Sequence, residues 1–166
     1  MKTLSRMMRH LFTTTAAGRR AFPPTTLKAI QTVIAKGETL HRAEVRLIIE
    51  PALPMQAVLS GMSTRERARE LFTNYRIWDT EENCGVLIYI NLADHKVEII
   101  TDRGVGRLIG PQDWQAICLA MTTGFAHGAF HDSVITALDQ LNLLLQAHLP
   151  ATGTRPNQLS NRPLVL

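Results

Sequence analysis

Four residues with oxygen-bearing side chains lie within or close to one short loop of this chain. Asp79, Glu82 and Asn83 supply two carboxylates and an amide in the loop, and Asp102 follows a later apolar segment. Carboxylate and amide oxygens are the ligands that Ca²⁺ and Mg²⁺ prefer in proteins. Carboxylates that converge repel one another unless a cation or a basic group joins them. These four residues are therefore a candidate site for Ca²⁺ or Mg²⁺.

A simpler interpretation of the same loop needs no metal. Arg76 precedes the loop, and Arg103 and Arg107 follow Asp102, so the acids can pair with these arginines in solvent. The loop also lacks the regular ligand spacing and the central glycine of an EF-hand, which favours this interpretation. Separately, Arg103 and Arg107 are the residues that we expect to contact a phosphate group or an acidic partner.

The sequence does not supply a complete set of catalytic residues. A metal-assisted phosphoric-ester hydrolase would use Asp79, Asn83 and Asp102 as ligands and Arg103 as a phosphate clamp. Cys84 is not followed by the arginine that a cysteine phosphatase needs, and no serine lies in a GxSxG motif. We therefore expect a non-catalytic binding or adaptor domain, dependent on a divalent cation if the site forms, with the hydrolase as the alternative.

The segments around the loop predict a small mixed β-sheet. Residues 44–50 and 86–92 are apolar, β-branched runs, and residues 97–101 form a third strand only four positions after the second. So short a connection predicts an antiparallel hairpin. The capping-box spacing of Ser63 and Glu66 predicts a helix between the first two strands, which favours a parallel crossover. Other helices are expected from Thr25 or Thr26, from Pro111, and from Asp132 or Ser133. The fold class is an α/β sandwich, αβα, with helices on both faces of the sheet.

The first 22 residues form a basic arm. Seven lysines and arginines precede Glu38, which is the first acidic residue of the chain. Residues 38–166 contain the other 11 basic residues and all 14 acidic ones, so their net charge is about −3. Residues 1–12 are amphipathic at helical spacing. Such an arm can bind an anionic membrane surface, an acidic protein patch or nucleic acid, and nucleic acid is not favoured here. The cations expected to make this contact are Arg6, Arg9, Arg19 and Arg20.

Apolar runs, the cysteine count and periodicity give the expected compartment and domain limits. No apolar run approaches the roughly 20 residues of a membrane helix, and two cysteines do not make a disulfide framework. We expect a cytoplasmic protein, peripheral at the membrane if the arm binds lipid. Residues 23–149 form the domain, and residues 150–166, which lack periodicity, form a disordered or irregular tail.

The order of these segments resembles a known family, the TPM domain. The resemblance is carried by residues 83–90, NCGVLIYI, and residues 96–105, KVEIITDRGV, and it extends roughly over residues 22–148. Cys84 stands where the family usually has a second asparagine, and Asp102 and Arg103 stand where a glycine and an aromatic residue are usual. The resemblance implies an αβα sandwich, divalent-cation binding and the phosphatase activity proposed for a plant member. It also implies a protein partner, which could be a membrane-bound TPM relative.

Overall fold

The computed structural model describes the backbone of residues 2–166 and the side chains of residues 4–166. Its four strands are β1 (Glu44–Glu50), β2 (Gly85–Asn91), β3 (Lys96–Thr101) and β4 (Leu164–Val165). Its helices are α1 (Lys2–Phe12), α2 (Thr15–Ala21), α3 (Pro24–Glu38), α4 (Met55–Leu59), α5 (Thr64–Asn74), α6 (Arg103–Gly106), α7 (Pro111–Ala126) and α8 (Phe130–His148).

The strands form one mixed sheet in the order β3-β2-β1-β4. β1 and β2 are parallel, and β2 and β3 pair as an antiparallel hairpin, so both predicted connections are confirmed. Every residue of β2 is buried, as its unbroken apolar run indicates. The parallel pairing brings the carboxyl ends of β1 and β2, Glu50 and Asn91, side by side.

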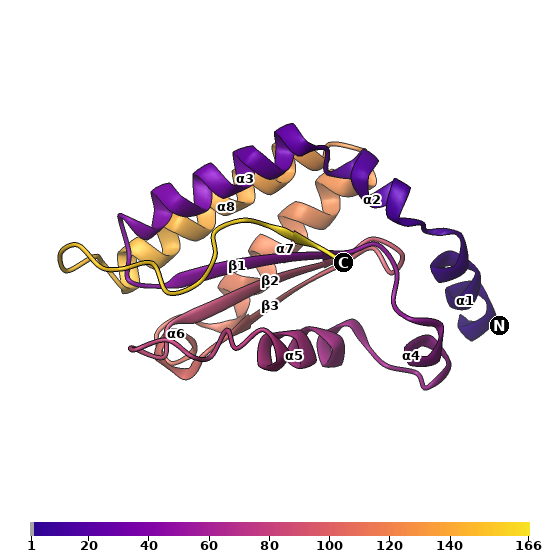
Figure 1. Cartoon of the computed structure of the whole chain (residues 1–166), viewed down its shortest axis with the longest axis horizontal. Coiled ribbons are helices and arrows are strands. Elements are labelled where there is room, and N and C mark those ends of the chain that lie inside the picture. The colour runs from indigo at the N-terminus through magenta and orange to yellow at the C-terminus, as the bar shows by residue number, and fades with distance from the viewer. Residues whose placement is uncertain (1) are drawn as a thin grey trace.

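Helices cover both faces of this sheet, which confirms the αβα sandwich (Figure 1). α3, α7 and α8 lie over one face, where Leu47, Ile49 and Ile88 enter the larger apolar core. α5 lies on the other face, where Ile48 and Leu87 enter a smaller core. The capping box of Ser63 and Glu66 starts α5 as predicted.

Two helix starts differ from the expected ones. α3 begins at Pro24 instead of at a threonine cap, because the fixed φ of proline suits the first helical position. α8 begins at Phe130, ahead of Asp132 and Ser133. Phe130 packs against Phe22 and Phe125, with ring centroids 5.7 and 5.0 Å away, and this aromatic contact holds the start of the helix.

The tail is irregular over most of its length, but its end belongs to the sheet. Leu164 and Val165 form β4, parallel to β1, and the Leu166 N–H donates to the Ile49 carbonyl at 2.9 Å. The sequence did not predict this strand, since two residues carry no periodic pattern. Among the described residues, no helix is both long enough and apolar enough to span a membrane.

Candidate functional site

The strand ends bring Asn83 and Asp102 together, as the hairpin predicts. The Asp102 N–H donates to the Gly85 carbonyl at 2.9 Å, and the Gly104 N–H donates to the Asn83 carbonyl at 2.9 Å. Gly104 is required at this approach, since a Cβ atom there would lie 2.5 Å from the Asn83 carbonyl oxygen and 2.6 Å from that of Glu82. The loop and the start of α6 therefore pack backbone against backbone.

Asp102 caps the short helix α6. Its Oδ1 accepts from the Arg103 N–H at 2.7 Å, whereas its Oδ2 is buried and has no hydrogen-bond partner among the described residues. Arg103 and Arg107 beside it are exposed, and no described carboxylate pairs with them. The side chain of Asp102 thus keeps one oxygen free to accept a further bond.

The other acids of the loop do not join Asp102. Glu82 forms ion pairs with Arg42, at 2.7 Å, and with Arg155. Asp79 is exposed, and its N–H donates to the Arg76 carbonyl. Within residues 4–166, no three His, Cys, Asp or Glu side chains converge in a group that could hold a metal ion. The cation implied by the resemblance therefore lacks a formed ligand set, although the free oxygen of Asp102 would suit one.

A second polar cluster lies at the carboxyl ends of β1 and β2, and the sequence did not reveal it. Arg67 of α5 donates to both oxygens of Glu50, at 3.1 and 2.7 Å, and the Tyr89 hydroxyl donates to Glu50 Oε2 at 2.6 Å. The Asn91 amide donates to the Tyr89 oxygen at 3.0 Å. Burial and the charge of Glu50 raise the pKa of Tyr89 well above its usual range. The hydroxyl therefore stays protonated and acts as a donor.

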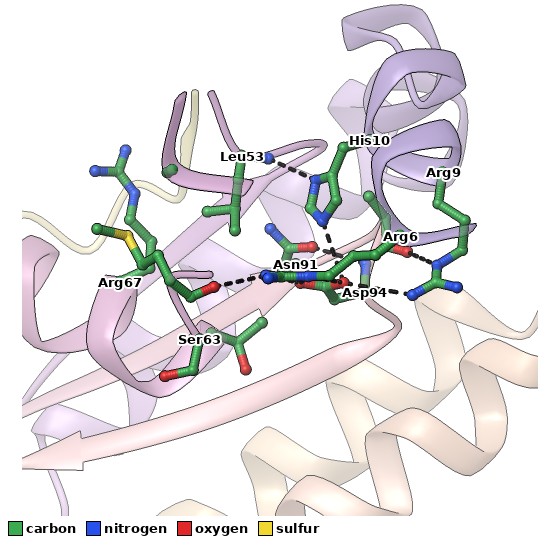
Figure 2. Close-up of polar contacts among 12 residues, drawn as sticks. Arg6, Arg9, His10, Leu53, Ser63, Arg67, Asn91 and Asp94 are labelled. Atoms are coloured by element: carbon green, nitrogen blue, oxygen red, sulfur yellow. Dashed lines mark hydrogen bonds and ion pairs between the residues drawn. The ribbon is translucent and has the colours of Figure 1, made fainter. Parts of the chain in front are cut away.

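This cluster continues into Asp94, which anchors α1 (Figure 2). The Asp94 N–H donates to Asn91 Oδ1 at 2.8 Å, and its carboxylate receives Nε and Nη2 of Arg6 at 2.7–3.1 Å. Burial of Asp94 disfavours its charge, but the hydrogen bonds from Arg6 and the adjacent His10 ring together outweigh burial and lower the pKa of the carboxyl group. Arg9 also reaches this turn, since its Nε donates to the Ala93 carbonyl at 3.0 Å and its Nη2 lies 3.7 Å from Asp94 Oδ1. Arg6 and Arg9 therefore both contact the domain, although the sequence led us to expect them at a partner surface.

His10 completes the anchor, and its proton position follows from its partners. Nδ1 accepts the Leu53 N–H at 2.9 Å, so a neutral ring carries its proton on Nε2. Nε2 lies 3.1 Å from Asp94 Oδ1, and the side chain is fully buried. The periodicity of residues 1–12 marked a polar face, but nothing in the sequence showed that Asp94 of the hairpin turn would receive it.

Comparisons with known proteins identify the fold. The family model of the TPM domain matches residues 18–143. This chain belongs to the TPM domain family. The NMR structure of the BA42 protein from the psychrophilic bacterium Bizionia argentinensis has the same fold, with a TM-score of 0.74 and 22% identity over 85% of this chain and 92% of that one. A search of curated proteins found no match.

α1 precedes the residues matched by the TPM domain and binds the domain through its polar face. Leu4, Met8, Leu11 and Phe12 fall on the opposite side of the helix, and 64%, 44%, 62% and 71% of their surfaces are exposed. Exposed apolar side chains gathered on one face mark an interaction site. The polar anchor therefore fixes the direction in which this apolar face points.

Proposed function

We propose that this TPM domain is a non-catalytic binding module that attaches to an anionic phospholipid surface through α1. The observation that supports this function is the orientation of α1, which is the opposite of the one expected from the sequence. Arg6 and His10 face the domain, whereas the apolar stripe of Leu4, Met8, Leu11 and Phe12 faces away from it. A helix held in this way can lie flat between the domain and a membrane.

The charge of the arm fits lipid better than an ordinary protein surface. Arg9 contacts Ala93 and Asp94 of the domain, but 46% of its side chain is exposed and it lines the same shallow hollow as the apolar stripe. Arg19 and Arg20 of α2 are exposed. No acidic residue precedes Glu38. Helices that lie in a membrane interface combine an apolar stripe with basic residues. Each basic residue near an anionic leaflet contributes about 1 kcal/mol to binding.

Catalysis receives no comparable support from the cysteine of the loop. Burial raises the pKa of Cys84, and its thiol donates to the Arg42 carbonyl at 3.0 Å. A protonated, buried thiol is a poor nucleophile. We therefore favour a binding role over a catalytic one and assign it to α1.

Vesicle flotation tests this function. The full chain should float with vesicles that contain phosphatidylserine but not with neutral phosphatidylcholine vesicles, and flotation should weaken between roughly 0.05 M and 0.5 M salt because salt screens charge. The double substitution Leu11→Asp, Phe12→Asp should abolish it, since it places two acids on the apolar stripe.

Two equally exposed leucines provide matched controls. Leu119 on α7 and Leu143 on α8 are each 66% exposed, so Leu119→Asp and Leu143→Asp change the same chemistry elsewhere. These variants should float like the unmodified chain. The membrane function fails if the unmodified chain does not float with anionic vesicles at low salt, in which case a protein partner remains for the stripe. It also fails if the controls lose flotation equally.

A further inference from the structure

A basic hollow of about 860 Å³ lies at the β4 edge of the molecule, away from α1 and from the acidic loop. Four cations line it: Arg19 of α2, Lys28 of α3, Arg46 of β1 and Arg162 of the tail. We propose that this hollow binds a phosphate monoester that carries an apolar substituent. The inference does not depend on the membrane function, because the two share only Arg19 and the hollow uses no residue of α1.

The cations of the hollow are not paired with carboxylates in the described part of the chain. No aspartate or glutamate lines it, and among residues 4–166 none of these four cations has a carboxylate within ion-pair distance. An anion that enters the hollow therefore meets these cations without displacing an acidic side chain. Arginine and lysine are also the side chains that most often bind phosphate oxygens.

Of the four cations, Arg46 gives the strongest reason to expect a bound anion. Its side chain leaves the central strand β1 and is half-buried, and burial lowers the pKa of the guanidinium. Its Nη1 donates to the carbonyls of Ser160 and Arg162, at 2.6 and 2.7 Å. These neutral oxygens fix the direction of the side chain but leave its charge uncompensated. The tail thus folds around a cation for which the described residues provide no anionic partner.

The remaining wall of the hollow is apolar. Leu27 of α3 and Leu164, Val165 and Leu166 of the β4 segment line it beside the cations. The start of α3, at Pro24, also reaches the hollow, and Pro23 gives it no side-chain cap. The positive end of this 15-residue helix adds to the attraction for an anion. A charged head on an alkyl or aryl group would use both kinds of wall.

Amide chemical-shift titration of the full chain tests the site. Hexyl phosphate should shift amides around Lys28, Arg162 and Val165, and inorganic phosphate and hexanol should shift the same amides at higher concentration only. The double variant Lys28→Gln, Arg162→Gln should bind hexyl phosphate about tenfold more weakly, because it removes two charge-assisted contacts. Both residues are exposed, so the variant should fold. Lys36→Gln with Arg69→Gln, an exposed lysine and an exposed arginine outside the hollow, is the matched control and should bind normally.

The source of the phosphate is distinguished by vesicles that contain phosphatidic acid. These are added to the Leu11→Asp, Phe12→Asp variant, in which α1 no longer contributes. Shifts around the hollow indicate a lipid headgroup, and shifts with hexyl phosphate alone indicate a soluble ester. The site is disproved if hexyl phosphate leaves the hollow unchanged, or if the control double variant weakens binding as much as Lys28→Gln, Arg162→Gln does. Normal binding of hexyl phosphate by the α1 variant would separate this result from failure of the membrane function.

Discussion

His10 of α1 points Nε2 at Oδ1 of Asp94, 3.1 Å away, and so ties the N-terminal helix to the turn between β2 and β3. Arg6 reaches the same carboxylate from one helical turn earlier. Only 8% of the Asp94 side chain is exposed, and Arg9 Nη2 lies 3.7 Å from the same Oδ1, so one acid holds three basic groups. This carboxylate is therefore the charged centre of the α1 anchor, to which Arg6 adds a bond to the Met62 carbonyl at 2.7 Å and Arg9 a bond to the Ala93 carbonyl at 3.0 Å.

Asp94→Asn should release α1 and destabilise the chain. The substitution leaves Arg6, Arg9 and His10 without their charged partner, and loss of this part-buried cluster costs about 1–3 kcal/mol. Urea unfolding should show this loss, and limited proteolysis should cleave near α1 faster. Asp139→Asn, an exposed residue of α8, is the control and should change neither measurement. Equal unfolding midpoints for Asp94→Asn and the unmodified chain would contradict the anchor.

The sequence predicted the sheet but not the anchor, and the physical reason lies in how each is encoded. Val86 to Asn91 is apolar at every position but the last, and Lys96 follows after a short turn, so local composition alone indicates a buried strand and a hairpin. The α1–Asp94 contact is different. Periodicity showed that the arm has two faces but not which of them packs against the domain. From the sequence, Asp94 could be identified only as a turn residue.

The candidate metal site shows the same limit. Antiparallel pairing placed Asn83 near Asp102 correctly, because the register of a hairpin follows from its turn. Glu82 instead pairs with Arg42 and Arg155, and Arg155 comes from the tail, for which no position could be predicted. Contacts between a loop and an aperiodic segment leave no local pattern in the sequence.

Tyr89→Phe should destabilise the polar cluster at the ends of β1 and β2. It removes a donor to Glu50 at 2.6 Å and an acceptor for Asn91 at 3.0 Å, both in buried positions. An unsatisfied buried polar group costs about 1–3 kcal/mol. Tyr75→Phe is the control, because Tyr75 is 41% exposed. Chemical denaturation that shows equal stability for both variants would contradict the role of the hydroxyl.

Glu38→Gln should stabilise the chain at pH 8 and not at pH 4. Burial raises the pKa of Glu38 to about 7, although its Oε1 accepts from the Val45 N–H at 3.1 Å. Between its unfolded pKa of about 4.5 and this value, the folded chain holds a proton that the unfolded chain has lost, so stability falls as pH rises. Glutamine keeps the acceptor and removes the charge. Unfolding free energies measured across this pH range should diverge above pH 5, whereas Glu81→Gln, in the exposed loop, should leave them parallel to those of the unmodified chain.

Gly104→Ala should separate the acidic loop from α6. The new Cβ would meet two backbone carbonyl oxygens, of Asn83 and Glu82, which cannot move aside as a flexible side chain would. Such a clash costs about 2–4 kcal/mol. Gly110→Ala is the control, since its Cβ would lie 3.7 Å from the side chain of Asp113. Thermal unfolding should therefore shift for the first variant and stay nearly constant for the second.

Cation binding at Asp102 should be weak in this chain and should respond to Arg155. Asp102 Oδ2 is the one loop oxygen that is buried without a partner in the described structure, whereas Glu82 is already paired with Arg42 and Arg155. Arg155→Gln removes one of the two cations that hold the carboxylate of Glu82, which leaves an oxygen of this side chain without its partner. Calorimetric titration with Ca²⁺ and with Mg²⁺ should show weak binding that tightens in Arg155→Gln and disappears in Asp102→Ala. Arg162→Gln, which removes another cation of the tail, should leave the affinity unchanged and so exclude a general effect of charge. If no heat is released with either ion even after Arg155→Gln, the loop is not a cation site, and Asp102 acts only as the cap of α6.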